Sequence, residues 1–156
     1  MNYLPYSFKE ITTPQNYQYS GQELLAEVSA VLILRSGGTL ESGLKRVVPD
    51  TRTGRLLIQS NSRTGEPELH YLKLPPCLQS QSHMVFLLDP QIASGAAAIM
   101  AVQVLKDHGV REENIVFVTY LSSATGLRRI TNVFPHLRIV TGCVRDGFER
   151  RWIDGR

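Results

Sequence analysis

The segment "MVFLLDPQIASGAAAIMAVQVLKDHG", residues 84–109, decides the fold that the sequence predicts. Its apolar start predicts a buried strand over residues 83–89, and its long second half predicts a helix over about residues 96–108. Gly109 follows as a left-handed cap, the conformation in which glycine commonly ends a helix. Between strand and helix stand Asp89, a proline and a run of small residues. A strand that reads as buried therefore ends on a lone carboxylate.

The rest of the chain repeats this alternation of apolar strands and helices. Further strands are expected at residues 30–35, 54–60, 68–74, 114–122 and 138–144. Further helices are expected at residues 39–48, with Thr39 as N-cap, and at residues 124–134. Because the strands are continuous apolar runs, both faces of their sheet should be covered. This is typical of an α/β fold with a mostly parallel sheet flanked by helices.

The length and composition fit one globular domain. A chain of 156 residues suits a single domain, residues 1–156, and 42% hydrophobic with 20% charged residues is an ordinary globular composition. Residues 1–29 are polar and turn-rich, and "TTPQNYQYSG" within them predicts a hairpin arm. Residues 145–156 are expected to form a tail.

Several function classes are disfavoured by the same composition. The two cysteines, Cys77 and Cys143, lack a CxxC or histidine partner, which argues against a disulfide framework or a zinc site and favours a reducing, cytoplasmic compartment. The net charge of +3 is weak, and the C-terminal arginines lack interleaved aromatic residues, so no nucleic-acid partner is expected. No apolar run is long enough for a membrane span, and the first ten residues hold no signal-peptide core.

The residues that follow each strand are the candidates for function, because parallel sheets bind ligands beyond the carboxyl ends of their strands. They are residues 35–38, 60–67, 89–97 and 122–126. In the third group, small residues let the backbone approach a ligand, and the N–H groups that start the next helix suit a phosphate. Ser94 adds a hydroxyl donor. The same spacing equally suits a tight strand-to-helix turn with Asp89 as a cap. Neither the P-loop signature nor the GxGxxG fingerprint occurs.

The segment "FLLDPQIASGAAAIMAVQVLKDHGV" resembles the ribose-phosphate motif of uracil phosphoribosyltransferases. The resemblance continues, in order and over about residues 10–147, in "TTPQNYQYSG", "VLILRSGGTLESGL", "GRLLIQSNSRTGEPELHYLKLP" and "VFPHLRIVTGCVRDG". The wording "TGEPELHYL" is most similar to the phosphoribosyltransferase-like domain attached to some uridine-cytidine kinases. The resemblance implies a type I phosphoribosyltransferase fold with a β-hairpin arm and a mobile loop.

The family's reaction converts uracil and 5-phosphoribosyl-1-diphosphate to UMP and pyrophosphate, a glycosyl transfer of pyrimidine salvage. By resemblance, Asp89 and Arg35 are catalytic: the carboxylate contacts the ribose hydroxyls and favours the developing cation, and the guanidinium neutralises the leaving group. The resemblance gives substrate-binding roles to Arg35, Ser36, Gly37, Asp89, Ile92, Ala93, Ser94, Gly95, Ala96, Ala97 and Arg63. It implies Mg²⁺ bound with the diphosphate and no metal site in the protein itself, a loop at residues 61–67 that closes over the substrate, and a homodimer.

The chain departs from the family pattern at four places. Ala97 stands where the family has a serine, and Ser60 stands where active enzymes have a basic residue, which Arg63 could replace. The C-terminal segment that reads the uracil edge is degenerate, with Trp152 as either a stacking face or a tail aromatic. The region before the arm is shorter than in the family. These departures leave open a non-catalytic binding or regulatory module, and also a domain that only dimerises.

Overall fold

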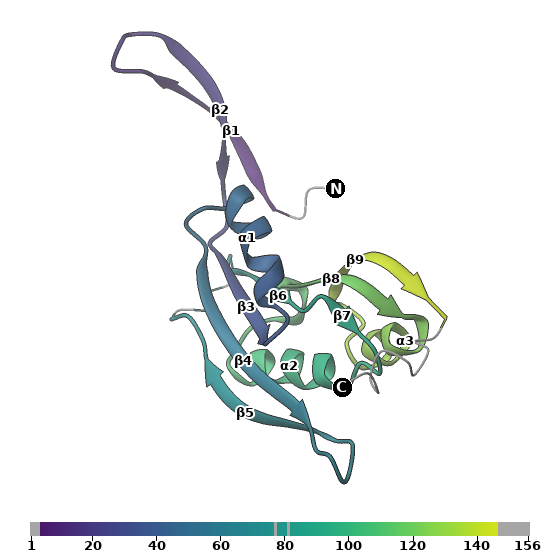
Figure 1. The fold of residues 1–156 in the computed structure, drawn as a ribbon. Helices are drawn as coiled ribbons and strands as arrows, with labels where there is room; N and C mark the ends of the chain where they lie inside the picture. The colour runs from purple at the N-terminus through teal and green to yellow at the C-terminus, as the bar shows by residue number, and fades with distance from the viewer. Residues whose placement is uncertain (1–3, 77, 81, 147–156) are drawn as a thin grey trace.

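The computed structural model describes residues 4–76, 78–80 and 82–146 (Figure 1). Its strands are β1 (Tyr6–Thr12), β2 (Gln18–Leu24), β3 (Val28–Leu34), β4 (Arg52–Ser60), β5 (Pro67–Lys73), β6 (Met84–Leu88), β7 (Gln91–Ile92), β8 (Ile115–Ser123) and β9 (Arg138–Arg145). Its helices are α1 (Gly38–Val47), α2 (Ala96–Asp107) and α3 (Ala124–Val133), with a 3-10 turn at Glu112–Asn114. Cys77, Trp152 and most of the expected tail lie outside the described residues.

The predicted, mostly parallel sheet is confirmed. The sheet has seven strands: six follow the order β5-β4-β3-β6-β8-β7, and the seventh, β9, pairs with β8. β8 pairs with β6 through its first half and with β7 near its end, while β9 follows most of its length. Among these strands β5 runs antiparallel to β4, and the two form a hairpin at the sheet edge. The carboxyl ends of the parallel strands therefore open at one edge of the sheet.

Each face of the sheet carries its own core, because side chains alternate along a strand. In β3, Val31 and Ile33 pack into the cluster that contains the apolar residues of α2 and α3. Ala30 and Leu32, the alternate residues of the same strand, pack into the cluster that contains Leu40 of α1. Figure 1 shows α1 on one face and α2 with α3 on the other. Burial on both faces explains why β3 and β6 are continuous apolar runs.

The N-terminal arm is confirmed as a hairpin. β1 and β2 pair antiparallel, from Tyr6 opposite Leu24 to Thr12 opposite Gln18, and the arm projects from the body (Figure 1). Nearly all of its residues are exposed. A two-stranded hairpin with no packed face is marginally stable in water, so the arm gains little support from the described body.

Two local features differ from the expectations, and both lie at strand ends. Thr39 is not the N-cap of α1: the helix starts at Gly38 after Gly37, and Thr39 Oγ1 donates to the carbonyl of Ser36 at 2.9 Å. The reason is that Gly37 N already bonds to the carbonyl of Ile33 at 2.8 Å, which starts the turn earlier. The short strand β7 was not predicted, since two residues carry no periodicity.

The left-handed cap at Gly109 is confirmed by its φ of 84°. None of the helices in the described part of the chain is both long and apolar enough to cross a membrane.

Candidate active site

The ends of β3 and β6 bring two of the predicted site segments together. The strands are parallel neighbours, with Leu32 opposite Leu88, so the loops that follow them emerge side by side. Ser36 Oγ donates to Asp89 Oδ1 at 3.1 Å across this gap. The backbone N–H of Gln91 makes a longer contact of 3.5 Å with the same oxygen. Asp89 and the loop at residues 35–38, which belong to two of the predicted strand-end groups, therefore lie side by side, and the bond between Asp89 and Ser36 is a contact that the sequence did not indicate.

The carboxyl group of Asp89 is electrostatically unusual. Burial raises its pKa from 3.8 to about 6, although the hydrogen bonds from Ser36 and from the N–H of Gln91 act in the opposite direction. Desolvation disfavours the charged form, which is the usual cause of a raised carboxyl pKa. At neutral pH the group is still ionised for most of the time. A half-buried carboxylate without a cationic partner in the described structure can accept hydroxyl hydrogen bonds or stabilise a developing positive charge.

Gly37 holds the two loops at close range. It is buried, and a Cβ built on it would lie 2.4 Å from the carbonyl oxygen of Leu88 and 2.7 Å from that of Ile33. No side chain fits that space, so glycine is required by the approach of the Leu88 carbonyl, which directly precedes Asp89. The neighbouring Arg35 is exposed.

The segment between β7 and α2 has the features expected of a phosphate loop. Gly95, at φ 81°, is the N-cap of α2, and no side chain caps the helix. Ser94 Oγ makes a 3.4 Å contact with the N–H of Ala96. The N–H groups of the first turn, which includes Ala97, are not engaged by intrahelical carbonyls. Ile92 differs from its neighbours because its side chain is 2% exposed and belongs to the core, so only its backbone can meet a ligand.

Ser123 supports the segment between β7 and α2. It lies within the predicted strand-end group at residues 122–126 but received no role there. Its hydroxyl caps α3 by accepting a hydrogen bond from Gly126 N at 2.8 Å, and it donates to the carbonyl of Ala93. A serine directly before a helix is a recognisable N-cap signal. Its second partner, thirty residues earlier in the chain, has no counterpart in the local sequence.

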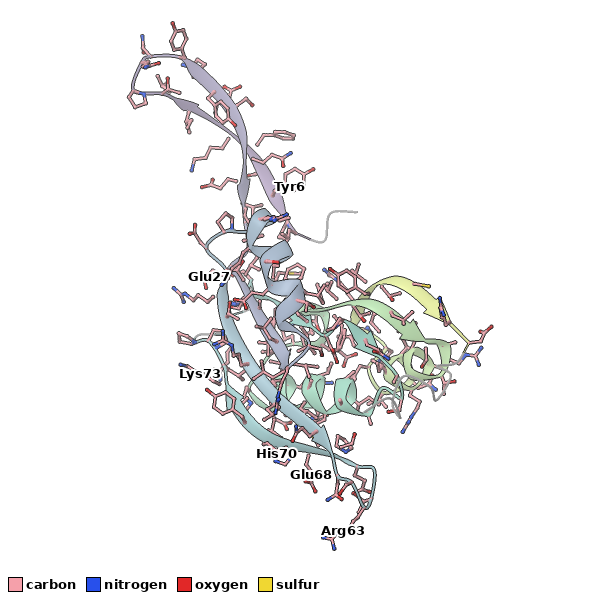
Figure 2. The ribbon with its side chains drawn as sticks, in the orientation of Figure 1. Tyr6, Glu27, Arg63, Glu68, His70 and Lys73 are labelled. Carbon is pink, nitrogen blue, oxygen red and sulfur yellow. The ribbon has the colours of Figure 1, made fainter. Side chains whose placement is uncertain are left out.

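The structure does not bring Arg63 to this site. Arg63 lies at the tip of the β4–β5 hairpin (Figure 2). Its backbone N–H bonds to Asn61 Oδ1 at 2.8 Å, which together with Gly65 at φ 73° shapes the tip. Within the described residues, no hydrogen bond or ion pair joins its side chain to Asp89. The closing of this loop over a substrate stays a prediction, as does the replacement of the family's basic residue at Ser60.

Other features of the molecule do not belong to this site. Among the described residues, no group of three or more His, Cys, Asp or Glu side chains is arranged to hold a metal ion. A cavity of about 590 Å³ lies under the base of the arm, beside Tyr6, Glu27 and His83. Another, of about 580 Å³, lies between α1 and the sheet. Neither is lined by the loops that follow β3 and β6.

Comparison with known proteins gives one consistent family. The family model "Uracil phosphoribosyltransferase" matches residues 1–152. Uracil phosphoribosyltransferase 1 of Schizosaccharomyces pombe is 37% identical over 149 residues, which cover 96% of this chain and 67% of that protein. Uridine-cytidine kinase-like 1 of Mus musculus is 41% identical over 145 residues, 92% of this chain and 26% of that protein. The chain thus spans about two thirds of the length of the first relative and a quarter of the second.

Solved structures agree with this result. The AQ2163 protein of Aquifex aeolicus superposes with a TM-score of 0.80 at 28% identity, covering 93% of this chain and 67% of that one. The APRTase of Giardia lamblia shares the fold at a TM-score of 0.59 and 14% identity, covering 88% of this chain and 93% of that one. These matches confirm the family and the fold that the sequence resembles. The chain has the type I phosphoribosyltransferase fold and belongs to the uracil phosphoribosyltransferase family.

Proposed function

We propose that this chain transfers a phosphoribosyl group from 5-phosphoribosyl-1-diphosphate to uracil, which yields UMP and pyrophosphate. The observation that carries the proposal is the hydrogen bond of 3.1 Å between Ser36 and Asp89, because it joins the two loops that must hold opposite ends of the scissile bond. In this role Asp89 accepts hydrogen bonds from the ribose hydroxyls. Its negative charge offsets the positive charge that develops at C1 as the diphosphate departs.

The phosphate groups of the substrate would be held at the two loops beside Asp89. The amides of Ser94, Gly95 and the first turn of α2 suit the 5′-phosphate, since a helix N-terminus favours an anion. Arg35 is exposed and free to pair with the diphosphate, which a planar guanidinium can bind in a bidentate manner.

Magnesium would enter this site bound to the diphosphate of the substrate. The single carboxylate of Asp89 suits an ion that is held mainly by phosphate oxygens and water, as Mg²⁺ usually is in phosphoryl and pyrophosphate sites. Bound there, the ion would neutralise part of the charge on the leaving diphosphate.

A non-catalytic binding module is the second candidate, and Ala97 is the observation that favours it. This residue occupies the first turn of α2, where the family has a serine hydroxyl beside the phosphate. Losing a hydrogen bond to a charged group costs about 1.5–3 kcal/mol, which weakens phosphate binding tenfold or more. A chain with this change can keep a phosphate site without efficient turnover.

Incubation of the full chain with labelled uracil, 5-phosphoribosyl-1-diphosphate and Mg²⁺ tests the proposal. We expect UMP to accumulate only when both substrates are present. Calorimetric titration with each substrate alone separates the two candidates. Phosphoribosyl diphosphate that binds without any UMP formed, at high concentration of folded protein, would support the binding module and rule out the enzyme.

We further propose that the chain works as a homodimer in the cytoplasm. The arm supports the first point, because it exposes large apolar side chains far from the body, with Phe8 at 75% and Tyr17 at 71%. Burial of this surface by a second copy would stabilise a hairpin that is marginal alone. The exposed free thiol of Cys143 suits a reducing compartment. Sedimentation equilibrium measures the mass, and a monomer at micromolar concentration would contradict the dimer.

A further inference from the structure

The amino end of α3 lies against the back of the phosphate loop. Ser123 Oγ, the cap of α3, donates to the carbonyl of Ala93. Six residues further along the chain, Arg129 Nη1 donates to the carbonyl of Ser94 at 3.0 Å. Two consecutive carbonyls of the loop are therefore held by side chains of one element.

Backbone packing brings the helix and the loop equally close. A Cβ built on Gly126 would lie 2.4 Å from the carbonyl oxygen of Ala93, and one built on Gly95 would lie 2.9 Å from the carbonyl oxygen of Gly126. The two glycines permit a contact that any other residue would push apart. The loop consequently rests on α3, and its carbonyl groups face that helix.

The direction of the carbonyls fixes the direction of the amides. The peptide bonds of this loop are trans, since the cis bond recorded among the described residues lies at Leu34–Arg35. In a trans peptide the C=O and the N–H point to opposite sides. With the carbonyls of Ala93 and Ser94 turned toward α3, the N–H groups of Ser94 and Gly95 point away from α3.

We propose that Arg129 is a positioning residue for phosphate binding, which holds the Ser94–Gly95 peptide so that the N–H of Gly95 faces the substrate's 5′-phosphate. This role rests on the proposed function, because it takes 5-phosphoribosyl-1-diphosphate as the ligand. The guanidinium acts through the peptide: a charged donor on the carbonyl polarises the peptide and strengthens the N–H on its other side.

The helix offers its own control for the charge. Arg128 is the preceding residue, is exposed like Arg129, and its side chain makes no hydrogen bond or ion pair with the described residues. Arg128→Ala and Arg129→Ala remove the same charge from the same turn of α3. A difference between the two variants therefore reports the contact with Ser94, not the net charge of the surface.

The experiment is a calorimetric titration of the full chain and its variants with ribose 5-phosphate, 5-phosphoribosyl-1-diphosphate and pyrophosphate. We expect Arg129→Ala to weaken the first two ligands by a common factor of about ten, since both carry the 5′-phosphate. Pyrophosphate, which uses the other loop, should bind as before. Arg128→Ala should leave all three affinities unchanged, and Arg129→Lys, which keeps a charged donor, should restore most of the loss.

Melting temperatures and turnover complete the design. Because Arg129 is exposed, Arg129→Ala should have the same melting temperature as the parent chain. It should raise the KM for 5-phosphoribosyl-1-diphosphate with little change in kcat. Equal effects of Arg128→Ala and Arg129→Ala, a parallel loss of pyrophosphate binding, or a parent chain that binds no ribose phosphate would each overturn the inference. If the ribose phosphates bind in the expected pattern while no UMP forms, the inference stands and the proposed uracil reaction fails.

Discussion

Replacing Asp89 with asparagine is expected to lower UMP formation about a hundredfold or more while it makes the folded chain more stable at pH 8. The activity falls because the amide cannot offset positive charge at the reacting carbon, and preorganised charge of this kind is commonly worth 10²–10³ in rate. The geometry survives, since the amide oxygen can still accept from Ser36 Oγ and from the N–H of Gln91. Steady-state kinetics and thermal melts measure the two effects.

The sign of the stability change follows from the pKa of Asp89. Burial raises it from 3.8 to about 6, so the folded chain binds this proton more tightly than the unfolded chain. The parent chain therefore loses stability as the pH rises from about 4 to about 6, and the loss is constant above that window. Asp89→Asn has no such titration. Its advantage in unfolding free energy should be small near pH 4 and should reach roughly 1–3 kcal/mol at pH 8.

The same titration gives an independent check on activity. If the ionised carboxylate is required, kcat/KM of the parent chain should rise with pH through about 6. Asp107→Asn is the matched control, because it removes the same charge from an exposed position at the far end of α2. It should leave kcat/KM unchanged. A stable, active Asp89→Asn chain would contradict a catalytic role, whereas an unstable one would contradict the desolvation argument.

Much of this site follows from simple rules of sheet architecture. The strand-end rule places Asp89 near residues 35–38 once β3 and β6 are known to be parallel, and the observed contact confirms it. The two-sided burial of β3 explains why its position could be read from apolar residues alone. Hydrophobic periodicity carries this information because it reflects burial, which is a property of the whole element.

The remaining features depend on which segments meet, and local sequence does not specify that. In the sequence, Ser123 looks like an ordinary helix cap, yet its hydroxyl also donates to the carbonyl of Ala93. Arg129 is one of two adjacent arginines, and only the packing of α3 distinguishes it from its neighbour. The expected cap at Thr39 failed because the hydrogen bond from Gly37 N to the carbonyl of Ile33 starts the turn earlier, at a position where Gly37 also lies against the Leu88 carbonyl of β6. Contacts between segments far apart in the sequence therefore decide the roles of Ser123 and Arg129.

Gly37 and Gly38 should respond to alanine in opposite directions, although they are adjacent and share the loop after β3. Gly37 has ordinary helical angles, φ −57° and ψ −23°, so its requirement is for space. A Cβ there would meet the carbonyl oxygen of Leu88 at 2.4 Å, and neither backbone can yield without moving β3 or β6. Overpacking of this kind costs about 1–3 kcal/mol or more. Gly38, the first residue of α1, has nothing within 4 Å of its Cβ position.

For Gly38→Ala we therefore expect unchanged or slightly higher stability, by up to about 1 kcal/mol, because alanine loses less backbone entropy in a helix. Urea denaturation of the two variants at one pH measures the contrast. The activity of Gly37→Ala should fall further than its stability explains, since a displaced Leu88 carbonyl also moves Asp89 away from Ser36. Excess substrate can stabilise the folded form of Gly37→Ala, but the kcat of this variant should stay low. Equal stability of Gly37→Ala and Gly38→Ala would mean that the loops after β3 and β6 are not held in close contact. The placement of Asp89 beside Ser36 would then have to arise from substrate binding.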